Sequence, residues 1–571
     1  MVTKIRLRRT TPESPPQRQR RYLRWFIAIA VVSPPVVALA GRAVAPVGIH
    51  AIAMRNCGDI CVTHFGAIPD DGQDDTEAIQ AAVDATIDLG GGTVRFPAGI
   101  YDVSSIDVAP GLTLEGTGAV LKKLDMQSKW ARTFTTQRHS HEGPTDSAPL
   151  IVRGLAFDGN RLNQGPYRNW EMEQQHSIFL TASGPGRLVA SVEDCHFRDG
   201  VADGITVFTN VEVSIEGCSA TDVFRGAVTV NGGNTEVHIS GLRAGGVEHP
   251  SGIDIEISSR NFGYDGSLRT RITADGLLLE GDFDVGLRDG STFLGNNIHS
   301  YPGPFHLYGE DSTIRISNSV FGVGPQPGSR VVMPQDVTFS NCSFISVPAD
   351  TSQPGGRYDG LRFQFHATID SLPIAATGAR VRILDCDFQL APGIFDEDIL
   401  TAIHGLEMAD GRDNQILVRG GSVASGFDRG VHLGRGGTVR VQGMSVDADT
   451  AFSFSGWAGF PLDVTLDGVS FGPSVVVPEN IFTHSVGNTI THRNIFLDES
   501  QNQIATQNGI VNNIYRGRRV IEGVDPPVTT PGFVGDLYRL KVPVIGETYE
   551  WLCTRSDVDD ATWNAFTFIG P

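Results

Sequence analysis

Three acidic residues in the middle of the chain stand at spacings that could bring carboxyl groups together. Asp254 and Glu256 are two residues apart in the run Gly252-Ile-Asp-Ile-Glu256, so on a β-strand both would face the same side, with Cα atoms about 6.7 Å apart. Asp203 precedes a similar run that begins at Gly204. Two carboxyl groups about 5–10 Å apart can cleave a glycosidic bond, one as the acid and the other as base or nucleophile. The spacing therefore predicts Asp203, Asp254 and Glu256 as catalytic residues.

Basic and aromatic side chains surround these acids in the sequence and are candidates for substrate binding. Arg225 precedes a run of the same kind that lies between the two acidic runs, and Arg288 belongs to the next one. An arginine could bind an acidic sugar or hold a carboxylate in its ionised form. An earlier strand-like run begins at a histidine, and the insertion 158–176 could overhang a groove with its aromatic side chains. The predicted substrate-binding residues are His176, Arg225, Arg288, Tyr167 and Trp170.

Acids and arginines on the outer face of a sheet also have a simpler explanation as solvated cross-strand pairs. The chain has 65 Asp and Glu against 45 Lys and Arg, a net charge of −20, so carboxylates will meet by chance. The same acidity argues against general nucleic-acid binding, which needs Lys and Arg to displace counterions. The 15 histidines are scattered, so we predict no transition-metal site.

An eight-residue pattern recurs through the body of the chain. It reads apolar, polar, apolar, polar, then Gly, Asn or Asp, then a small or apolar residue, any residue, and an apolar residue. The alternation has the period of a β-strand, and the Gly, Asn or Asp marks a tight bend between two short strands. The closest copies are 23–25 residues apart without long helices between them, which predicts a parallel β-helix. Ten copies begin at residues 150, 190, 213, 237, 272, 314, 337, 381, 439 and 464.

Four of the 7 cysteines fall at the same position of this pattern. Because equivalent positions stack in successive coils, Cys195 and Cys218 should be neighbours in the interior, either as free thiols or as a disulfide. Cys57 and Cys61 are close in sequence and could close a small loop in an oxidising compartment. The other spacings do not match a Cys-x-x-Cys metal site.

Residues 62–101 suggest an opening helix followed by a strand. Asp75 or Thr76 can cap a helix from Glu77 to about Leu89, because acids in the first turn complement the helix dipole. Three glycines at 90–92 would end it. The acids at 70, 71, 74 and 75 allow calcium binding, but capping and solvation explain them more simply. We therefore predict no cofactor, with calcium as the open alternative.

The same segment carries a family resemblance, through Phe65-Gly-Ala, Asp71-Gly, Asp74-Asp-Thr, Ala78-Ile-Gln, the three glycines and Phe96-Pro-Ala-Gly. This run resembles the start of the pectate-lyase-like superfamily. The resemblance implies an all-β fold, a right-handed single-stranded parallel β-helix with an N-terminal capping helix. That helix would plug the first coil and protect its edge.

The polygalacturonase branch of the superfamily has motifs that this chain largely lacks. There is no Asn-x-Asp and no Gly-His-Gly, and the Asp-Asp pairs lie outside the repeats. We predict an enzyme that cleaves a polysaccharide by carboxylate acid/base hydrolysis. One alternative is a lyase or epimerase acting on acidic glycans. The other is a non-catalytic glycan-binding surface protein similar to a tail spike, a resemblance that also leaves a homotrimer open.

Residues 1–40 have the composition of a signal peptide or a membrane anchor. They hold eight basic residues, one acid, an apolar run at 25–32 and the small-residue site Ala38-x-Ala40. Pro34 and Pro35 interrupt the apolar stretch, which falls short of the roughly 20 residues needed to span a membrane. We predict an exported protein (extracellular, periplasmic or at the cell surface) that contacts a membrane only if this segment is uncleaved. The predicted domains that follow are a β-helix at 57–484, a linker at 485–531 and a small C-terminal β-module at 532–571.

Overall fold

The structure is a computed structural model, and its description begins at Ile60. The predicted signal at 1–40, Cys57, Tyr167 and Trp170 lie outside the described residues. Within the described part of the chain, no helix is long and apolar enough to cross a membrane. The described residues are 60–141, 148–165, 172–183, 186–246, 251–256, 269–280, 282–301, 305–323, 330–332, 335–346, 358–364, 366–369, 372–375, 378–391, 400–406, 414–434, 437–456, 462–483, 489–493, 505–507, 520–523, 537–540, 550–555 and 562–566.

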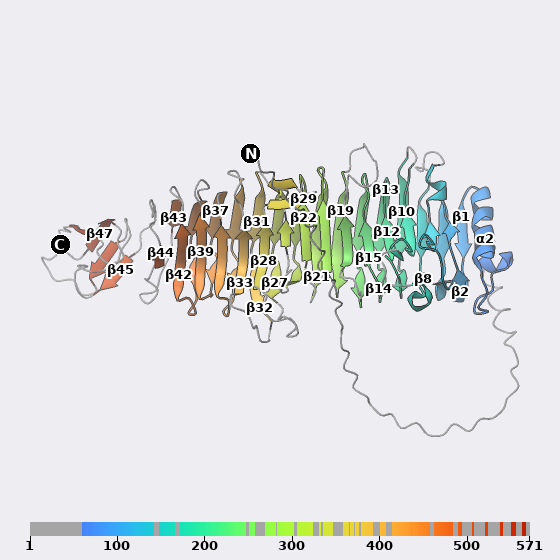
Figure 1. Ribbon diagram of the computed structural model, residues 1–571, viewed down its shortest axis with the longest axis horizontal. Helices are drawn as coiled ribbons and strands as arrows, with labels where there is room; N and C mark the ends of the chain where they lie inside the picture. The colour runs from blue at the N-terminus through green and yellow to red at the C-terminus, as the bar shows by residue number, and fades with distance from the viewer. Residues whose placement is uncertain are drawn as a thin grey trace, which may run out of the picture. The chain divides into compact units, whose positions relative to one another are not determined.

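Two long parallel sheets form the body of the chain (Figure 1). Within the described residues, sheet A has 27 strands and sheet B has 15. One coil illustrates the plan, since β13 (Val211–Glu216) and β14 (Ser219–Thr221) belong to sheet A and β15 (Gly226–Val230) belongs to sheet B. Each strand pairs in parallel with its equivalents in neighbouring coils, as β13 does with β10 (Leu188–Glu193) and β16 (Glu236–Ser240). The predicted parallel β-helix is confirmed.

Sheet B supplies one strand to each coil. Neighbouring strands lie about 4.8 Å apart, so side chains at equivalent positions form columns along the stack. In order, its strands are β3 (Ile106–Asp107), β6 (Phe134–Thr135), β9 (Ile178–Leu180), β12 (Ile205–Val207), β15, β18 (Ser251–Glu256), β20 (Asp282–Leu287), β22 (Phe305–Gly309), β25 (Arg330–Val332), β28 (Tyr358–Gln364), β33 (Leu400–Leu406), β36 (Arg429–Gly434), β39 (Thr450–Gly456), β42 (Val477–Thr483) and β44 (Ala505–Gln507).

The tight bends of sheet A lie where the repeat pattern predicts them. The fifth residue of every predicted copy has a positive φ, as in Gly154 at 67°, Asp194 at 50° and Asn318 at 50°. Glycine reaches this region without a Cβ clash, and Asn and Asp tolerate it better than other residues. Two more bends, at Asn297 and Gly420, belong to copies that the pattern did not reveal.

The interior between the sheets is apolar and contains ladders of like residues. The rings of Phe157 and Phe197 stack with centroids 5.1 Å apart. Cys195 and Cys218 are buried free thiols in successive coils, which confirms the predicted interior thiol stack and not the disulfide. Cys61 is disulfide-bonded.

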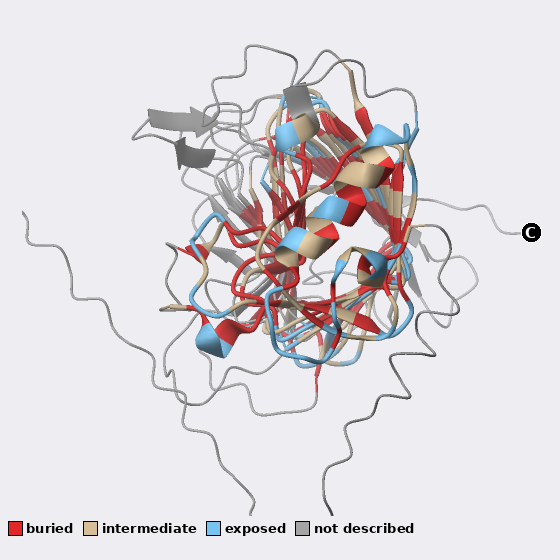
Figure 2. Ribbon diagram, turned by 90° about the vertical axis from the view of Figure 1, so that its right-hand side faces the viewer, coloured by how far each residue is buried: buried red, intermediate tan, exposed pale blue. Residues whose placement is uncertain are grey.

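Helix α2 (Thr76–Asp88) covers the first coil, and Figure 2 shows it across the end of the stack. Its apolar face is buried through Ile79, Ala82 and Val83. The helix is confirmed and Asp75 is its N-cap residue, but the Asp75 side chain makes no capping hydrogen bond, because its Oδ1 accepts from the Ile68 N–H at 2.8 Å. Asp74 instead accepts from the Thr76 N–H at 2.9 Å.

The acidic cluster beside this helix is thus engaged with the backbone. Burial is the main cause that raises the pKa of Asp75 to about 6. Among the described residues, no group of three or more His, Cys, Asp or Glu side chains is placed to hold a metal ion.

Strand pairing at the C-terminal end continues beyond the predicted boundary at residue 484. β43 (Thr489–Arg493) pairs in sheet A, and β44 pairs in sheet B. A separate four-stranded sheet contains β45 (Val520–Gly523), β46 (Leu537–Leu540), β47 (Glu550–Arg555) and β48 (Thr562–Phe566). Its first strand lies within the segment predicted as a linker.

Candidate functional site

The outer face of sheet B carries a column of aligned side chains, which are polar in the coils from β12 to β39. Strand pairing aligns Thr229 with Asp254, Asp254 with Asp284, and Asp284 with His306. Because the strands are about 4.8 Å apart, acids and bases of successive coils come within reach of a single ligand. The column continues through Arg330, Arg362, His404 and His432.

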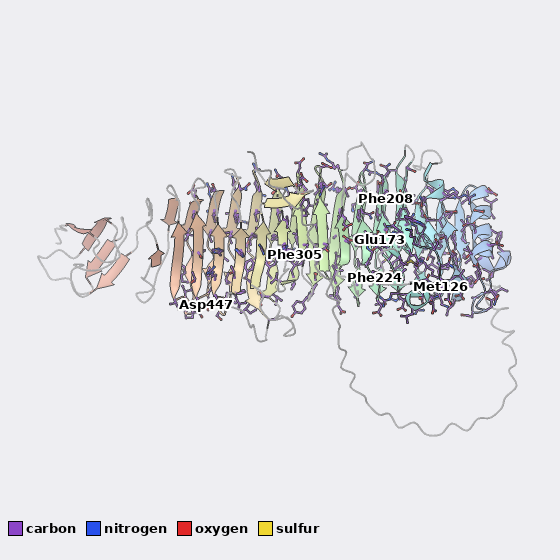
Figure 3. All side chains as sticks on the ribbon, in the orientation of Figure 1. Met126, Glu173, Phe208, Phe224, Phe305 and Asp447 are labelled. Atoms are coloured by element: carbon purple, nitrogen blue, oxygen red, sulfur yellow. The ribbon has the colours of Figure 1, made fainter. Side chains whose placement is uncertain are left out.

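An open groove of about 550 Å³ lies over strands β18, β20, β22 and β25 of this column. Figure 3 labels Phe305, the residue before His306, within this part of the stack. The groove brings together three of the predicted residues, Asp254, Glu256 and Arg288. Its ionisable lining consists of Asp254, Glu256, Asp284, Arg288, His306, Tyr308 and Arg330.

Asp254 is the carboxyl group whose proton affinity differs most from its ordinary value in this groove. Burial is the main cause that raises its pKa from 3.8 to about 8, and the neighbouring carboxylates of Glu256 and Asp203 add to the effect. Arg225 Nη2 lies 3.4 Å from Asp254 Oδ2 and lowers the pKa, but it does not outweigh burial and the like charges. Asp254 is therefore protonated at neutral pH and can donate a hydrogen bond or a proton.

Asp203 lies beneath this surface, not in the groove, and its side chain has no exposed area. His176 Nδ1 is 3.0 Å from Asp203 Oδ2, and the Gly226 N–H donates to Oδ1 at 3.1 Å. Burial alone would raise the pKa of Asp203, but the hydrogen bond from His176 and the charge of Arg225 hold it below the ordinary value. A buried ionised carboxylate at this position can orient the neighbouring side chains.

His176 is buried beside Asp203 and also lies away from the groove. Its ring stacks on Phe179 with centroids 5.7 Å apart. Burial lowers the pKa of His176, so the imidazole is neutral, with Nδ1 in contact with the carboxylate. The contact of His176 with substrate stays a prediction.

Arg225 connects three coils through its guanidinium group. Nε lies 3.8 Å from Asp203 Oδ1, Nη2 lies 3.4 Å from Asp254, and Nη1 lies 3.7 Å from Glu173 Oε2. Figure 3 labels Glu173, which belongs to the insertion expected to overhang a groove. Only 11% of the Arg225 side chain is exposed, so this arginine mainly holds carboxylates in place.

Asp284 and His306 form an ion-pair contact inside the groove, with His306 Nδ1 at 3.0 Å from Asp284 Oδ1. They occupy neighbouring positions of the polar column. When Nδ1–H donates to the carboxylate, the second ring nitrogen, Nε2, is left as the basic atom. With 41% of its side chain exposed, His306 can reach a ligand in the groove.

The remaining predicted residues differ in where they lie. Arg288 lines the groove, with Nε at 3.9 Å from Glu310 Oε2 and its guanidinium carbon 5.2 Å from the Tyr308 ring centroid. Glu256 is exposed at the end of β18. Tyr167 and Trp170 lie outside the described residues.

The sequence did not predict Asp284, His306 and Arg330 as site residues. The strand-like runs that begin at a glycine do not correspond to one another in all coils. Strand pairing places Gly286 beside Glu256. An alignment that matches Gly286 with Gly252 is therefore wrong by four residues for this coil. A better signal was available in the alternation of Phe283, Val285 and Leu287, all of which are buried. Aligned on these inward residues, Asp284 would have matched Asp254.

Residues 60–254 match a family model described as Rhamnogalacturonase A/epimerase, pectate lyase-like. The predicted pectate-lyase-like resemblance is confirmed for this segment. The matched segment includes Asp203, Arg225 and Asp254 and ends before Asp284 and His306.

Curated relatives from Azotobacter vinelandii match a small part of the chain. Mannuronan C5-epimerase AlgE3 is 35% identical over 113 residues, which are 18% of this chain and 6% of that protein. Alginate lyase 7 is 56% identical over 110 residues, which are 18% of this chain and 13% of that protein. The chain therefore spans only a small fraction of the length of these relatives.

Among solved structures, the A-module of Mannuronan C-5 epimerase AlgE4 from Azotobacter vinelandii aligns with 75% of this chain and 100% of its own. The TM-score is 0.37 and the identity is 18%. An alignment at this level adds nothing on activity.

Proposed function

We propose that this chain is an enzyme that acts on a uronate-containing polysaccharide and removes the proton at C5 of the sugar. The observation that carries the proposal is one groove that combines a protonated carboxyl group, Asp254, with the His306–Asp284 pair and with Arg288 and Arg330. The relatives named as mannuronan C5-epimerases and alginate lyase support a uronate polymer as the substrate class.

The first requirement of this chemistry is to neutralise the sugar carboxylate. Asp254 would donate a hydrogen bond to it, and Arg288 and Arg330 supply positive charge along the same groove. A carboxylic acid that stays neutral in order to donate such a bond is an established way to stabilise an enolate-like charge. With the carboxylate neutralised, the C5–H bond becomes acidic enough for a side-chain base.

His306 is then the base that takes the C5 proton on Nε2, while Asp284 holds Nδ1–H and stabilises the imidazolium. The electron pair of the C5–H bond moves into the carboxylate-stabilised anion. Return of a proton from the opposite face inverts C5 and gives an epimer. Alternatively, the pair forms a C4–C5 double bond and the glycosidic C4–O bond breaks, with a proton going to the leaving oxygen, which gives a lyase product.

Hydrolysis is the second candidate, favoured by one specific observation. Asp254 keeps a proton at neutral pH, and Glu256 lies two residues further along the same strand and lines the same groove. A carboxyl group that keeps its proton and a second carboxyl group at this separation suit acid/base cleavage of a glycosidic bond.

An isotope experiment separates these readings. The purified chain is incubated with polymannuronate in D₂O, followed by proton NMR for deuterium at C5, ultraviolet absorbance for unsaturated ends, and a reducing-end assay. We expect either deuterium at C5, the product of epimerisation, or unsaturated ends that carry no hydrogen at C5, the product of elimination. New reducing ends without deuterium or unsaturation would establish hydrolysis and reject our proposal. Glycan binding without any product would instead favour a non-catalytic surface protein.

The proposed function also bears on where the chain acts and on its oligomeric state. An enzyme acting on a large polymer meets its substrate outside the cell, which agrees with the signal-like composition of residues 1–40. A homotrimer, which the sequence left open, stays a prediction.

A further inference from the structure

The outer face formed by the first strand of each coil in sheet A has a divided charge. Toward the N-terminal end, over β10, β13, β16 and β19 (Arg271–Leu279), acids predominate: it carries Glu193, Glu212, Glu216, Glu236 and Asp275 against one arginine, Arg271. Further along, over β31 (Arg380–Leu384), β34 (Gln415–Arg419) and β37 (Gly437–Gln442), it carries Arg380, Arg382, Arg419 and Arg440. In a chain of net charge −20, such a group of arginines is not expected from composition.

A hollow of about 270 Å³ lies among these arginines, which we call the arginine hollow. Its polar lining comes from Arg380, Arg382, Gln415, Thr438, Arg440 and Gln442. Strand pairing places Leu417 between Arg382 and Arg440 in one column. These two arginines are therefore two coils, or roughly 10 Å, apart with an apolar side chain between them.

The arginines of the hollow differ in how they are paired. Arg382 Nη1 lies 2.6 Å from Asp336 Oδ1 on β26 (Asp336–Ser340). Arg380 and Arg440 are exposed and form no ion pair with any acid in the described part of the chain. Their guanidinium groups can therefore bind carboxylates of a ligand, often through two parallel hydrogen bonds.

We propose that the arginine hollow is a second binding site for an acidic polysaccharide, which holds the polymer without reacting with it. The class of ligand rests on the proposed function, but the site is separate from the groove. The groove lies on sheet B over β18 to β25, whereas the hollow lies on sheet A over β31 to β37.

The lining of the hollow suits sugars better than phosphate polymers. Duplex nucleic acid carries a charge about every 1.7 Å and is bound through dense Lys and Arg contacts. Here the two unpaired arginines are interspersed with amide and hydroxyl groups that can bond sugar hydroxyls, and Leu417 can pack against a sugar ring. A polymer with one carboxylate per sugar matches that mixture.

The test uses the double variant Arg380→Ala/Arg440→Ala in the full-length chain. Binding of polymannuronate is measured by calorimetry in a His306→Gln background, so that turnover does not interfere. We expect affinity to fall on the order of tenfold, because two charge-assisted contacts are removed. The matched control Arg243→Ala/Arg271→Ala removes two exposed arginines of sheet A outside the hollow and should leave affinity unchanged.

Two results would overturn the second site. The first is an equal loss of polymannuronate affinity in the hollow and control variants, or no loss of affinity in either, while the melting temperatures of both stay unchanged. The second is binding of single-stranded DNA as tightly as polymannuronate, which would make the hollow a general polyanion surface. Turnover of short oligosaccharides by the hollow variant, with His306 intact, should stay normal. If no turnover is seen in any variant but binding still depends on Arg380 and Arg440, the proposed function fails and the second site stands.

Discussion

The groove on sheet B and the arginine hollow on sheet A both present guanidinium groups, but in different surroundings. In the groove region, Arg225 is largely buried and lies 3.4 Å from Asp254, whose pKa is raised to about 8. In the hollow, Arg380 and Arg440 are exposed. Charges that are buried together shift each other's proton equilibria, whereas exposed charges are screened by water and salt. We therefore expect proton chemistry in the groove and simple charge recognition in the hollow.

The largest expected effect in this comparison is the loss of the groove base. His306→Gln should lower kcat about a thousandfold, because a general base contributes on the order of 10²–10⁴ to rate. Deuterium incorporation at C5 of polymannuronate measures it. His238→Gln, an exposed histidine on sheet A, is the matched control and should keep the rate, as should Arg380→Ala/Arg440→Ala. A nearly normal rate in His306→Gln would remove this residue from the mechanism.

The next effect concerns the buried charges beneath the groove. Asp203→Asn should lower the free energy of unfolding by about 3–5 kcal/mol, because it leaves the Arg225 charge partly unpaired in a buried setting. Urea denaturation measures the change. The hollow variant, which removes only exposed charges, should unfold at nearly the same urea concentration as the parent chain. Similar curves for Asp203→Asn and the parent would show that Asp203 is not a structural anchor.

A smaller effect should appear in the pH profile of Asp254→Asn. The parent activity should fall as pH rises through about 8, where Asp254 loses its proton, while the amide keeps an N–H donor. We expect roughly tenfold lower activity without this alkaline limb, measured as kcat between pH 6 and 10. Complete loss of activity at every pH would instead indicate proton donation to a leaving oxygen.

The same substitution makes a prediction for stability. Folding raises the pKa of Asp254 from 3.8 to about 8, so its contribution to stability is complete below about pH 4 and is lost as pH rises through 8. Thermal melts of Asp254→Asn should therefore gain on the parent as pH increases over this window. Parallel pH dependence in both chains would contradict the raised pKa. The hollow variant should follow the parent throughout.

The smallest effect is that of salt. Raising the salt concentration from about 50 to 500 mM shortens the screening length severalfold and should weaken the exposed contacts of Arg380 and Arg440. We expect KM for long polymannuronate to rise a few-fold, while kcat/KM for short oligosaccharides changes little. Steady-state kinetics at several salt concentrations measure both, with the hollow variant as the control. An equal salt response in that variant would locate the screened contacts elsewhere.

The bends and the core could be predicted from the sequence because they follow from local rules. Residues such as Gly154 and Asn318 mark positive φ values that few other residues adopt, and alternating apolar residues mark the interior. The capping helix followed from acids and glycines at its ends. These features depend on neighbours in the sequence, so they do not require knowledge of how coils align.

The candidate functional residues were harder to predict from the sequence, because their proximity depends on the strand register between coils. Asp254 and Glu256 were found because they share one strand. Asp284 and His306 join them only through strand pairing, and insertions of different length separate the coils. The burial of Asp203 and His176 was equally invisible, since an outward position of a sheet can still be covered by neighbouring side chains. The arginine hollow joins residues that are 35 and 23 positions apart along the chain.

Because successive coils are evenly spaced, the number of coils between two sites fixes their separation along the stack. Each added coil would move the arginine hollow about 4.8 Å further from the groove without altering the lining of either. A polymer held at both places at once must be long enough to cover the coils between β25 and β31 and to pass from sheet B to sheet A. Inserting or deleting whole coils between these strands would therefore change the preferred chain length of the substrate while leaving its chemistry unchanged.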